Sequence, residues 1–196
     1  NNPVNLVIAS DATGVQRYFR TGDKATILGL ELEARKNLIT DEDDNAQLSA
    51  GFNFTYMHTE QDLYANVSGS AFTTSFNRAT DQLQGASPIL VNANLNYSPT
   101  KWENYKPTAT LVFSYFADRI DALGSGQIGN IVEKSVPTLD FVWKNNIGEN
   151  LEINFSASNI LDPRIERVRE GTPLGDIVLS GYNRGSNISL GFNYKF

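Results

Sequence analysis

The sequence of 196 residues predicts an all-β fold, in which about seven or eight antiparallel strands form part of a transmembrane β-barrel. Three observations support this prediction. Apolar and polar residues alternate through seven segments, the links between segments alternate between short and long, and the chain closes on a patterned strand. Successive side chains of a strand point to opposite faces, so this alternation gives each segment an apolar and a polar face. No segment shows the 3.6-residue apolar repeat of a helix.

The terminal strand carries the clearest pattern. One expected face holds Ile188, Leu190, Phe192, Tyr194 and Phe196, and the other holds Asn187, Ser189, Gly191, Asn193 and Lys195. An apolar face backed by a polar one suits a wall with lipid outside and water inside. The positions of Ser189, Gly191, Phe192, Tyr194 and Phe196 resemble the C-terminal assembly signal of bacterial outer-membrane barrels. The alternative interpretation is the last strand of a soluble β-sandwich.

The other six segments repeat the alternation. In chain order their apolar positions are Leu28, Leu30, Leu32 and Ala34; Leu48, Ala50, Phe52, Phe54 and Tyr56; Val91, Ala93, Leu95 and Tyr97; Ala109, Leu111, Phe113, Tyr115 and Ala117; Leu139, Phe141 and Trp143; and Leu151, Ile153, Phe155 and Ala157. Val4 to Ile8 is expected to be the tail of an eighth strand. Many residues between these positions are amides, such as Asn92 and Asn94, which suit a watery lumen because buried amides need partners.

This pattern predicts which side chains meet lipid. We expect outward positions for Leu30, Leu32, Phe52, Phe54, Leu95, Phe113, Phe141, Phe155, Leu190 and Phe192. Tyr97, Trp102, Tyr105 and Trp143 fall near strand ends, where aromatic side chains anchor a barrel at the lipid–water interfaces.

The links between segments separate the barrel from the sandwich. Short turns are expected near residues 41–45, 99–106 and 146–150, and long loops over 58–86, 119–134 and 162–185. Sandwiches also alternate in hydropathy, but loops this long are uncommon in compact soluble domains. Transmembrane barrels have short turns on one side and long loops on the other. The loop asymmetry therefore favours the barrel, with the long loops together on one side of it.

Composition narrows the class further. The chain has no cysteine, which excludes a disulfide framework and zinc–thiolate sites, and its net charge of −6 argues against nucleic acid. The mean hydropathy is −0.31, and no apolar run reaches the 18 or so residues of a membrane helix. The first residues read as mid-domain sequence without a signal peptide, so the start is expected to be a processed or truncated end.

Three stretches resemble the TonB-dependent outer-membrane transporters. They are 27–34 (ILGLELEA), similar to the family's G-[IVL]-E-[LAV]-E strand; 157–162 (ASNILD), similar to its penultimate-strand x-N-L-[FL]-D signature; and 183–196 (NRGSNISLGFNYKF), similar to its closing strand with Arg and Gly transposed. Each motif alone is weak, but three in the right order are strong. Together they touch the chain after about residue 24.

The resemblance implies a larger protein. Family members have a 22-stranded barrel filled by an N-terminal plug that contacts TonB, so residues 1–196 are expected to be the C-terminal part of the barrel domain, with the plug absent from this chain. The implied location is the bacterial outer membrane. The implied partners are outer-membrane lipid, the remaining strands and plug, the TonB energising complex, the barrel-assembly machinery and a surface lipoprotein lid.

The implied function is active uptake of a siderophore, cobalamin, oligosaccharide or peptide. Two alternatives stay open: a small closed barrel that acts as an anchor or adhesion protein, and a subunit of a larger envelope assembly without transport. A plug domain and TonB box encoded upstream of residue 1 would separate the first from the second.

No catalytic constellation is present, so we expect no enzyme, metal or cofactor. His58 is the single histidine, and Asp41 to Asp44 lacks the central glycine of a calcium loop and reads as a solvated turn. The glycines at 124, 126 and 129 have no βαβ context, so they predict a flexible loop rather than a nucleotide site.

Ligand contacts, if this part of the barrel makes them, are expected in the long loops. The candidates are Tyr64, Phe72, Phe76 and Arg78 in the first loop, and Arg164, Arg167, Arg169 and Tyr182 in the last. Aromatic rings stack on sugars or flat chelates, and arginine recognises carboxylate or phosphate. The competing expectation is that most of these side chains pack the loops together.

Overall fold

The computed structural model describes residues 2–10, 14–69, 72–102, 104–172 and 175–196. Within these residues every regular element is a β-strand and every strand pairing is antiparallel, apart from one isolated parallel bridge between Val7 and Leu123. The prediction of an all-β antiparallel fold is therefore confirmed. No closed barrel is seen: the strands form one large open sheet and three smaller sheets.

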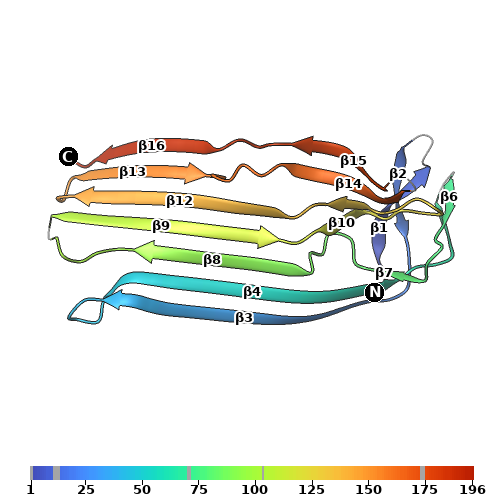
Figure 1. Ribbon diagram of the computed structural model, residues 1–196, viewed down its shortest axis with the longest axis horizontal. Helices are drawn as coiled ribbons and strands as arrows, with labels where there is room; N and C mark the ends of the chain where they lie inside the picture. The colour runs from blue at the N-terminus through green and yellow to red at the C-terminus, as the bar shows by residue number, and fades with distance from the viewer. Residues whose placement is uncertain (1, 11–13, 70–71, 103, 173–174) are drawn as a thin grey trace.

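The main sheet consists of the seven predicted strands. They are β3 (Ala25–Thr40), β4 (Ala46–Asp62), β8 (Ile89–Tyr97), β9 (Tyr105–Phe116), β12 (Val136–Ile147), β13 (Leu151–Ser158) and β16 (Asn187–Tyr194). Their order in the sheet is their order in the chain, from β3 at one edge to β16 at the other, with the short β7 (Thr80–Asp81) beside β4. Figure 1 shows the long strands side by side in one layer.

The register places like residues opposite one another. Phe54 lies opposite Leu32 and Val91, and Phe155 lies opposite Trp143. Paired residues share a face of the sheet, so apolar rows form on one side and polar rows on the other. We call these sides the apolar face and the polar face.

Short and long links lie at opposite ends of this sheet. The β3–β4, β8–β9 and β12–β13 links are at the end of the molecule that also holds the C-terminus, which we call the turn end. The long links are at the other end, the loop end (Figure 1). Consecutive long strands run in opposite directions, so each long link starts and finishes at the same end.

The long links are not plain loops. They contain β10 (Arg119–Ala122), β11 (Ile131–Glu133), β14 (Ile165–Thr172) and β15 (Gly175–Tyr182), which form a second sheet in that order. The order repeats β9, β12, β13 and β16, and Figure 1 shows each extension strand continuing the long strand that adjoins it in the chain. Four strands of the main sheet thus continue toward the loop end after a short interruption of the strands, which we call the break. We call β10, β11, β14 and β15 the extension sheet.

The expectation that Val4 to Ile8 is the tail of an eighth barrel strand is wrong. Val4 to Ile8 belongs to β1 (Val4–Ser10), which pairs with β2 (Val15–Arg20) in a separate hairpin and not with the main sheet. Figure 1 shows this hairpin lying across the loop end, near the small hairpin of β5 (Asn66–Gly69) and β6 (Phe72–Ser75). Strand alternation says that a segment is a strand, but not which strand it pairs with.

The buried apolar core also lies at the loop end. One cluster joins Val7, Phe19, Leu63, Phe76, Ile120 and Leu123, and a second joins Ile8, Ala122 and Ile131. The extension sheet, the two small hairpins and these clusters form a compact cap. The main sheet contributes little to this core, because most of its side chains are exposed or half-buried on both faces; Val136 is its buried aliphatic residue, and Thr59, Gln61 and Asn145 are buried polar ones.

Candidate functional site

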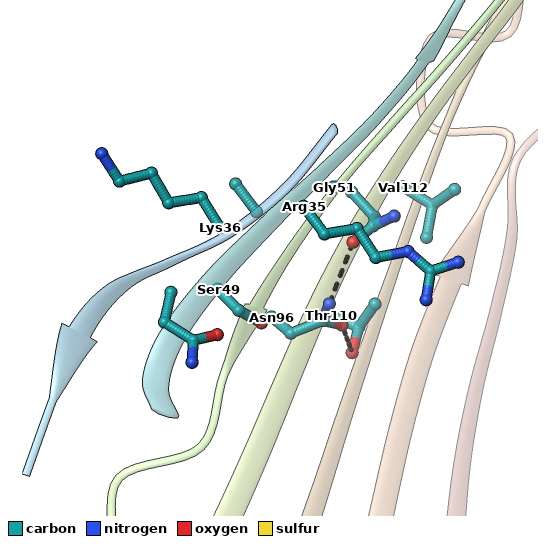
Figure 2. Close-up of a pocket in the computed structure, with 10 residues that line it drawn as sticks. Arg35, Lys36, Ser49, Gly51, Asn96, Thr110 and Val112 are labelled. Carbon is teal, nitrogen blue, oxygen red and sulfur yellow. Dashed lines mark hydrogen bonds between the residues drawn. The ribbon is translucent and has the colours of Figure 1, made fainter. Parts of the chain in front are cut away.

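The polar face of the main sheet is a ladder of amides and hydroxyls. The Nδ2 group of Asn96 donates to Oδ1 of Asn94 at 3.0 Å, and the hydroxyl of Thr110 donates to Oδ1 of Asn96 at 2.9 Å (Figure 2). Near β3, Nδ2 of Asn53 donates to Glu31 at 2.9 Å. Neighbouring side chains satisfy part of each amide, and the remaining groups face solvent. This surface can hydrogen-bond a polar solute.

A shallow hollow of about 680 Å³ lies over this ladder. Figure 2 shows Arg35 extending along the hollow while Lys36, the next residue of β3, points away from it. Gly51 leaves room in the hollow for the side chain of Asn94, because a Cβ at position 51 would lie 2.7 Å from Nδ2 of Asn94. Arg35 forms an exposed ion pair with Glu33 at 2.7 Å. The hollow holds no acid–base pair arranged for catalysis.

In the part of the chain that the structure describes, no protein layer covers the apolar face. None of the ten side chains expected to meet lipid is buried, and Leu30, Leu190 and Phe192 are 56%, 61% and 69% exposed. The soluble sandwich required these side chains to pack in a dry core, and they do not. On β4 the apolar row from Leu48 to Tyr56, whose side chains are exposed or half-buried, covers roughly 27 Å at about 3.4 Å per residue. That height is close to the apolar band of about 25 Å on transmembrane barrels.

Aromatic side chains border the apolar face at the turn end. The rings of Trp102 and Tyr105 lie 5.6 Å apart, and the Tyr105 hydroxyl donates to Oδ1 of Asn145 at 2.8 Å. Tyr97 and Trp143 occupy the same row of the register. At the other end of this face, Tyr56 and Tyr115 lie close to the loop end.

The assembly-signal residues lie along one edge of the main sheet and continue past its turn end. Ser189, Gly191, Phe192 and Tyr194 lie in β16, and Phe196 follows it, with its ring edge-on to Tyr194 at 5.2 Å. Ser189 shares a hydrogen bond with Ser156 across the pair at 2.7 Å on the polar face. Phe192 and Phe196 are exposed on the apolar face and after its end.

Two stretches that carry the family resemblance meet at the break. Asn159 donates from Nδ2 to the Gly185 carbonyl at 2.9 Å, and Asp162 accepts from the Gly185 amide at 2.8 Å. Asn159 and Asp162 have φ values of 54° and 39°, a region that asparagine and aspartate enter more readily than other side chains. The Asn–x–x–Asp spacing thus joins the β13–β14 link to the β15–β16 link.

At the same break, an ion-pair cluster joins the β11–β12 link to the β9–β10 link and to β14. Lys134 donates to Asp118 at 2.9 Å and to Glu170 at 3.0 Å. Burial opposes ionisation of Asp118, but hydrogen bonds from Lys134 and from the Ser135 amide hold its pKa below the ordinary value. The hydrogen bond to Asp118 raises the pKa of Lys134. Asp118 and Lys134 therefore remain charged across neutral pH.

The first-loop ligand candidates are largely engaged in the cap. Phe76 is buried in the larger apolar cluster. Arg78 lies over its ring at 5.7 Å and donates to Asp81 at 2.6 Å and Asn130 at 2.7 Å. The Tyr64 hydroxyl donates to Asp23 at 2.5 Å, which raises the pKa of Tyr64. The side chain of Phe72 lies outside the described residues.

The last-loop candidates are spread along the extension sheet. Arg164 is paired with Glu166 at 2.8 Å, and Arg167 is paired with Asp121. Arg169 lies opposite Ile131 in the β11–β14 pair, and Tyr182 is exposed opposite Ile165. The structure does not bring the seven candidates whose side chains it describes together around one cavity. Most of them hold the cap together.

The glycines of the 124–129 segment serve close packing. A Cβ at Gly129 would lie 1.7 Å from the Glu170 carbonyl oxygen, and one at Gly124 would lie 2.1 Å from that of Ile128. The segment is therefore seated against β14, which the expectation of a flexible loop missed. His58 lies within β4, opposite Leu28.

The Asp41–Asp44 segment is a hydrogen-bonded turn. The carboxylate of Asp41 accepts from the Thr100 hydroxyl at 2.8 Å and from the amides of Asp43 and Asn45, and these bonds, that of Thr100 first, lower its pKa. Among the described residues, no group of three or more His, Cys, Asp or Glu is arranged to hold a metal ion.

A buried polar network was not foreseen from the sequence. Nδ2 of Asn5 donates to the Thr21 hydroxyl at 2.5 Å and to Oε1 of Gln61 at 2.7 Å, and Gln61 donates to the Gln82 carbonyl at 2.8 Å. It ties the β1–β2 hairpin to β4. Its members are 16 and 56 residues apart, so no local pattern could have revealed it.

In comparisons with known proteins, no family model, curated protein or solved structure matches this chain. Across the residues that the structure describes, no helix is long and apolar enough to cross a membrane.

Proposed function

We propose that this chain forms part of the barrel wall and outer loops of a TonB-dependent transporter in the bacterial outer membrane. The single observation that carries the proposal is the uncovered apolar face of a one-layer sheet whose other face is polar. Soluble monomers rarely expose apolar patches larger than a few hundred Å². Lipid on one side and water on the other removes this conflict.

The open edges support a larger barrel. In the described part of the chain, β3 pairs only with β4, and β16 pairs only with β13. In hydrocarbon each unpaired backbone group costs several kcal/mol, so membrane sheets close into barrels. The remaining strands, together with the plug and its contact with TonB, belong to the rest of the transporter in this proposal.

The polar face would then line the lumen, and the cap would lie at the outer surface. Amides and hydroxyls on the polar face suit passage of a hydrated, polar nutrient. A siderophore, cobalamin, an oligosaccharide and a peptide all fit that description. The three family-like stretches support transport in particular, and the contacts of Asn159 and Asp162 with Gly185 give two of them a shared structural role.

A structural outer-membrane barrel, as an anchor or as a subunit of an envelope assembly, is the second candidate. The observation that favours it is the engagement of Phe76, Arg78 and Arg167 inside the cap. Side chains held in this way are not available to a solute unless the cap rearranges.

Deletion of the full-length gene separates the two candidates. Transport predicts loss of growth on one nutrient among ferric siderophores, cobalamin, oligosaccharides and peptides, and the same loss when TonB is deleted instead. The structural role predicts unchanged uptake of all four classes with altered envelope integrity. Recovery of the protein outside the outer-membrane fraction would contradict both.

A further inference from the structure

We propose that Lys36 binds the headgroup phosphate of a phospholipid on the outside of the barrel wall, close to the turn end of the sheet. The inference rests on the membrane orientation proposed above, in which the turn end lies in the periplasmic leaflet. It goes further by assigning a lipid site to a charged side chain that the transport proposal leaves unexplained.

Lys36 lies on the apolar face of the sheet although it carries a charge. In the register it pairs with Ala50, which in turn pairs with Leu95. Figure 2 shows its side chain directed away from the hollow on the polar face, whereas that of Arg35 extends along the hollow. Across the main-sheet strands, all of which the structure describes, Lys36 is the single lysine or arginine on the apolar face. Charged side chains that face hydrocarbon are costly and mark functional sites.

The sheet offers Lys36 no counter-charge. Its neighbours on the same face are Ala34 and Leu38 along β3 and Ala50 on β4. The side chain is exposed, and in the part of the chain that the structure describes its ammonium has no ion pair and no hydrogen bond. An ammonium on a lipid-facing surface needs an anion or water. The partner of Lys36 therefore comes from its surroundings.

The position of Lys36 along the strand brings its ammonium to the lipid–water interface. Leu48 and Tyr97, which pair with each other on the next two strands, lie one two-residue step nearer the turn end, roughly 7 Å at about 3.4 Å per residue. Tyr97 belongs to the aromatic residues that border the apolar face at this end. A lysine stem lies along apolar surface while its ammonium extends to the polar interface. The headgroup phosphates lie at that level.

The surface beside Lys36 also suits an acyl chain. Ala50 lies between Phe52 and Leu48 along the apolar row of β4, and Ala34 adjoins Lys36 on β3. Small side chains on two sides leave the lysine stem accessible to a lipid tail. A phospholipid thus matches both parts of the site, with its tail on the apolar residues and its phosphate on the ammonium.

Other anions fit this position less well. A carboxylate on a neighbouring protein would have to leave water together with the ammonium, and this desolvation opposes pairing. A lipid phosphate is already at the interface, and lysine binds phosphate as a point charge. Inorganic phosphate has no apolar part to contact Ala34 and Ala50. The lipid phosphate is therefore the partner that the position favours.

A photoactivatable phospholipid tests the site in the full-length protein. Parent, Lys36→Gln and Lys36→Arg are reconstituted in phosphatidylglycerol vesicles with a trace of the same lipid carrying a diazirine near its headgroup, and adducts are mapped by peptide. We expect adducts on β3 and β4 around position 36 in the parent and in Lys36→Arg, and about fivefold fewer in Lys36→Gln. Fivefold corresponds to the roughly 1 kcal/mol that one basic residue contributes near an anionic lipid surface.

Three controls accompany these variants. Lys106→Gln removes an exposed lysine from the polar face at the same end and should keep the parent yield around position 36. Adducts on β9 report insertion into the vesicles and should be equal in all variants. An excess of inorganic phosphate should leave the adducts around position 36 unchanged, because the site takes a lipid phosphate and not the free ion.

Four results would overturn the inference: equal yields around position 36 in the parent and Lys36→Gln, the same loss in Lys36→Arg, the same loss in Lys106→Gln, or competition by inorganic phosphate. A protein that fails to insert would overturn it too, because its apolar face would then meet no lipid. Failure of the transport proposal looks different. A protein that gives the adducts around position 36 but imports nothing would contradict transport alone.

Discussion

At the scale of single residues, close packing and hydrogen bonding hold the cap together. The main sheet depends instead on the amide and hydroxyl ladder of its polar face and on what covers its apolar face. Gly129 lets the 124–129 segment touch the backbone of β14, and Lys134 joins two carboxylates across the break. Neither residue would be chosen as functional from its sequence context. Both determine whether the extension sheet stays aligned with the long strands.

Replacing Gly129 by alanine should destabilise the cap. The new Cβ would lie 1.7 Å from the Glu170 carbonyl oxygen, which is backbone and cannot swing away. Overpacking of this kind costs about 1–3 kcal/mol in the free energy of unfolding. Gly191→Ala is the matched control, because its Cβ would have 4.0 Å to the nearest atom. Equal stability of the two variants in denaturant titrations would contradict the packing described for Gly129.

The Asp118–Lys134 pair predicts a pH dependence. The folded pKa of Asp118 is below its ordinary value of 3.8, so its contribution is present above that pH and is lost as pH falls through the folded pKa. Lys134 has a raised pKa, so its contribution is lost only as pH rises past 10.5. Both groups are partly exposed, so screening limits the pair to about 0.5 kcal/mol.

The comparison is between the parent protein and Asp118→Asn. Their unfolding free energies should differ at pH 7, and the difference should close in acid below the folded pKa of Asp118. Asp176→Asn, which removes one exposed carboxylate outside this cluster, serves as control for the change in net charge. A difference between the parent and Asp118→Asn that persists unchanged into acid would rule out the charge as its cause.

At the scale of elements, the sequence predicted what local alternation can encode. All seven main-sheet strands were found because each has a period-two pattern over eight or more residues or an aromatic row, as in Leu139, Phe141 and Trp143. The polar ladder of Asn92, Asn94 and Asn96 was foreseen for the same reason. β10 and β11 were missed because they have only four and three residues, and β14 because it carries charge on both faces.

Local alternation of apolar and polar residues could not predict which distant segments pair with each other. The β1–β2 hairpin alternates as a barrel strand would, yet its position depends on Asn5 meeting Gln61 and on Val7 meeting Leu123. The ligand candidates failed to converge for a related reason: residue type predicts what a side chain can bind, whereas loop packing decides whether it is free to do so.

The terminal strand provides an element-scale prediction. Phe196→Ala in the full-length protein should reduce outer-membrane abundance and leave ligand affinity per folded molecule unchanged. The assembly machinery is expected to pair with the edge of β16 and hold Phe192, Tyr194 and Phe196 in an apolar groove. Loss of one ring removes about 2–3 kcal/mol of burial, enough to weaken recognition tens-fold. Normal abundance by immunoblot together with lost affinity in a ligand titration would contradict the assembly role expected of Phe196.

At the scale of the whole molecule, a polar–apolar sheet and a compact cap divide the structure into two environments. The cap is folded like a small soluble unit, with its own apolar clusters and a buried polar network. The main sheet has apolar side chains on one face with no protein layer over them in the described residues. The account therefore depends on what lies against that face.

The most direct test measures the surroundings of consecutive residues in β8. Nitroxide labels on single cysteines at positions 93 to 97, in the full-length protein reconstituted in bilayers, report access to oxygen, which concentrates in lipid, and to a water-soluble nickel chelate. The chain has no cysteine of its own to interfere. We expect labels replacing Ala93, Leu95 and Tyr97 to favour oxygen and those replacing Asn94 and Asn96 to favour the chelate, with a period of two. Equal access of the chelate to both sets would contradict the membrane-spanning sheet.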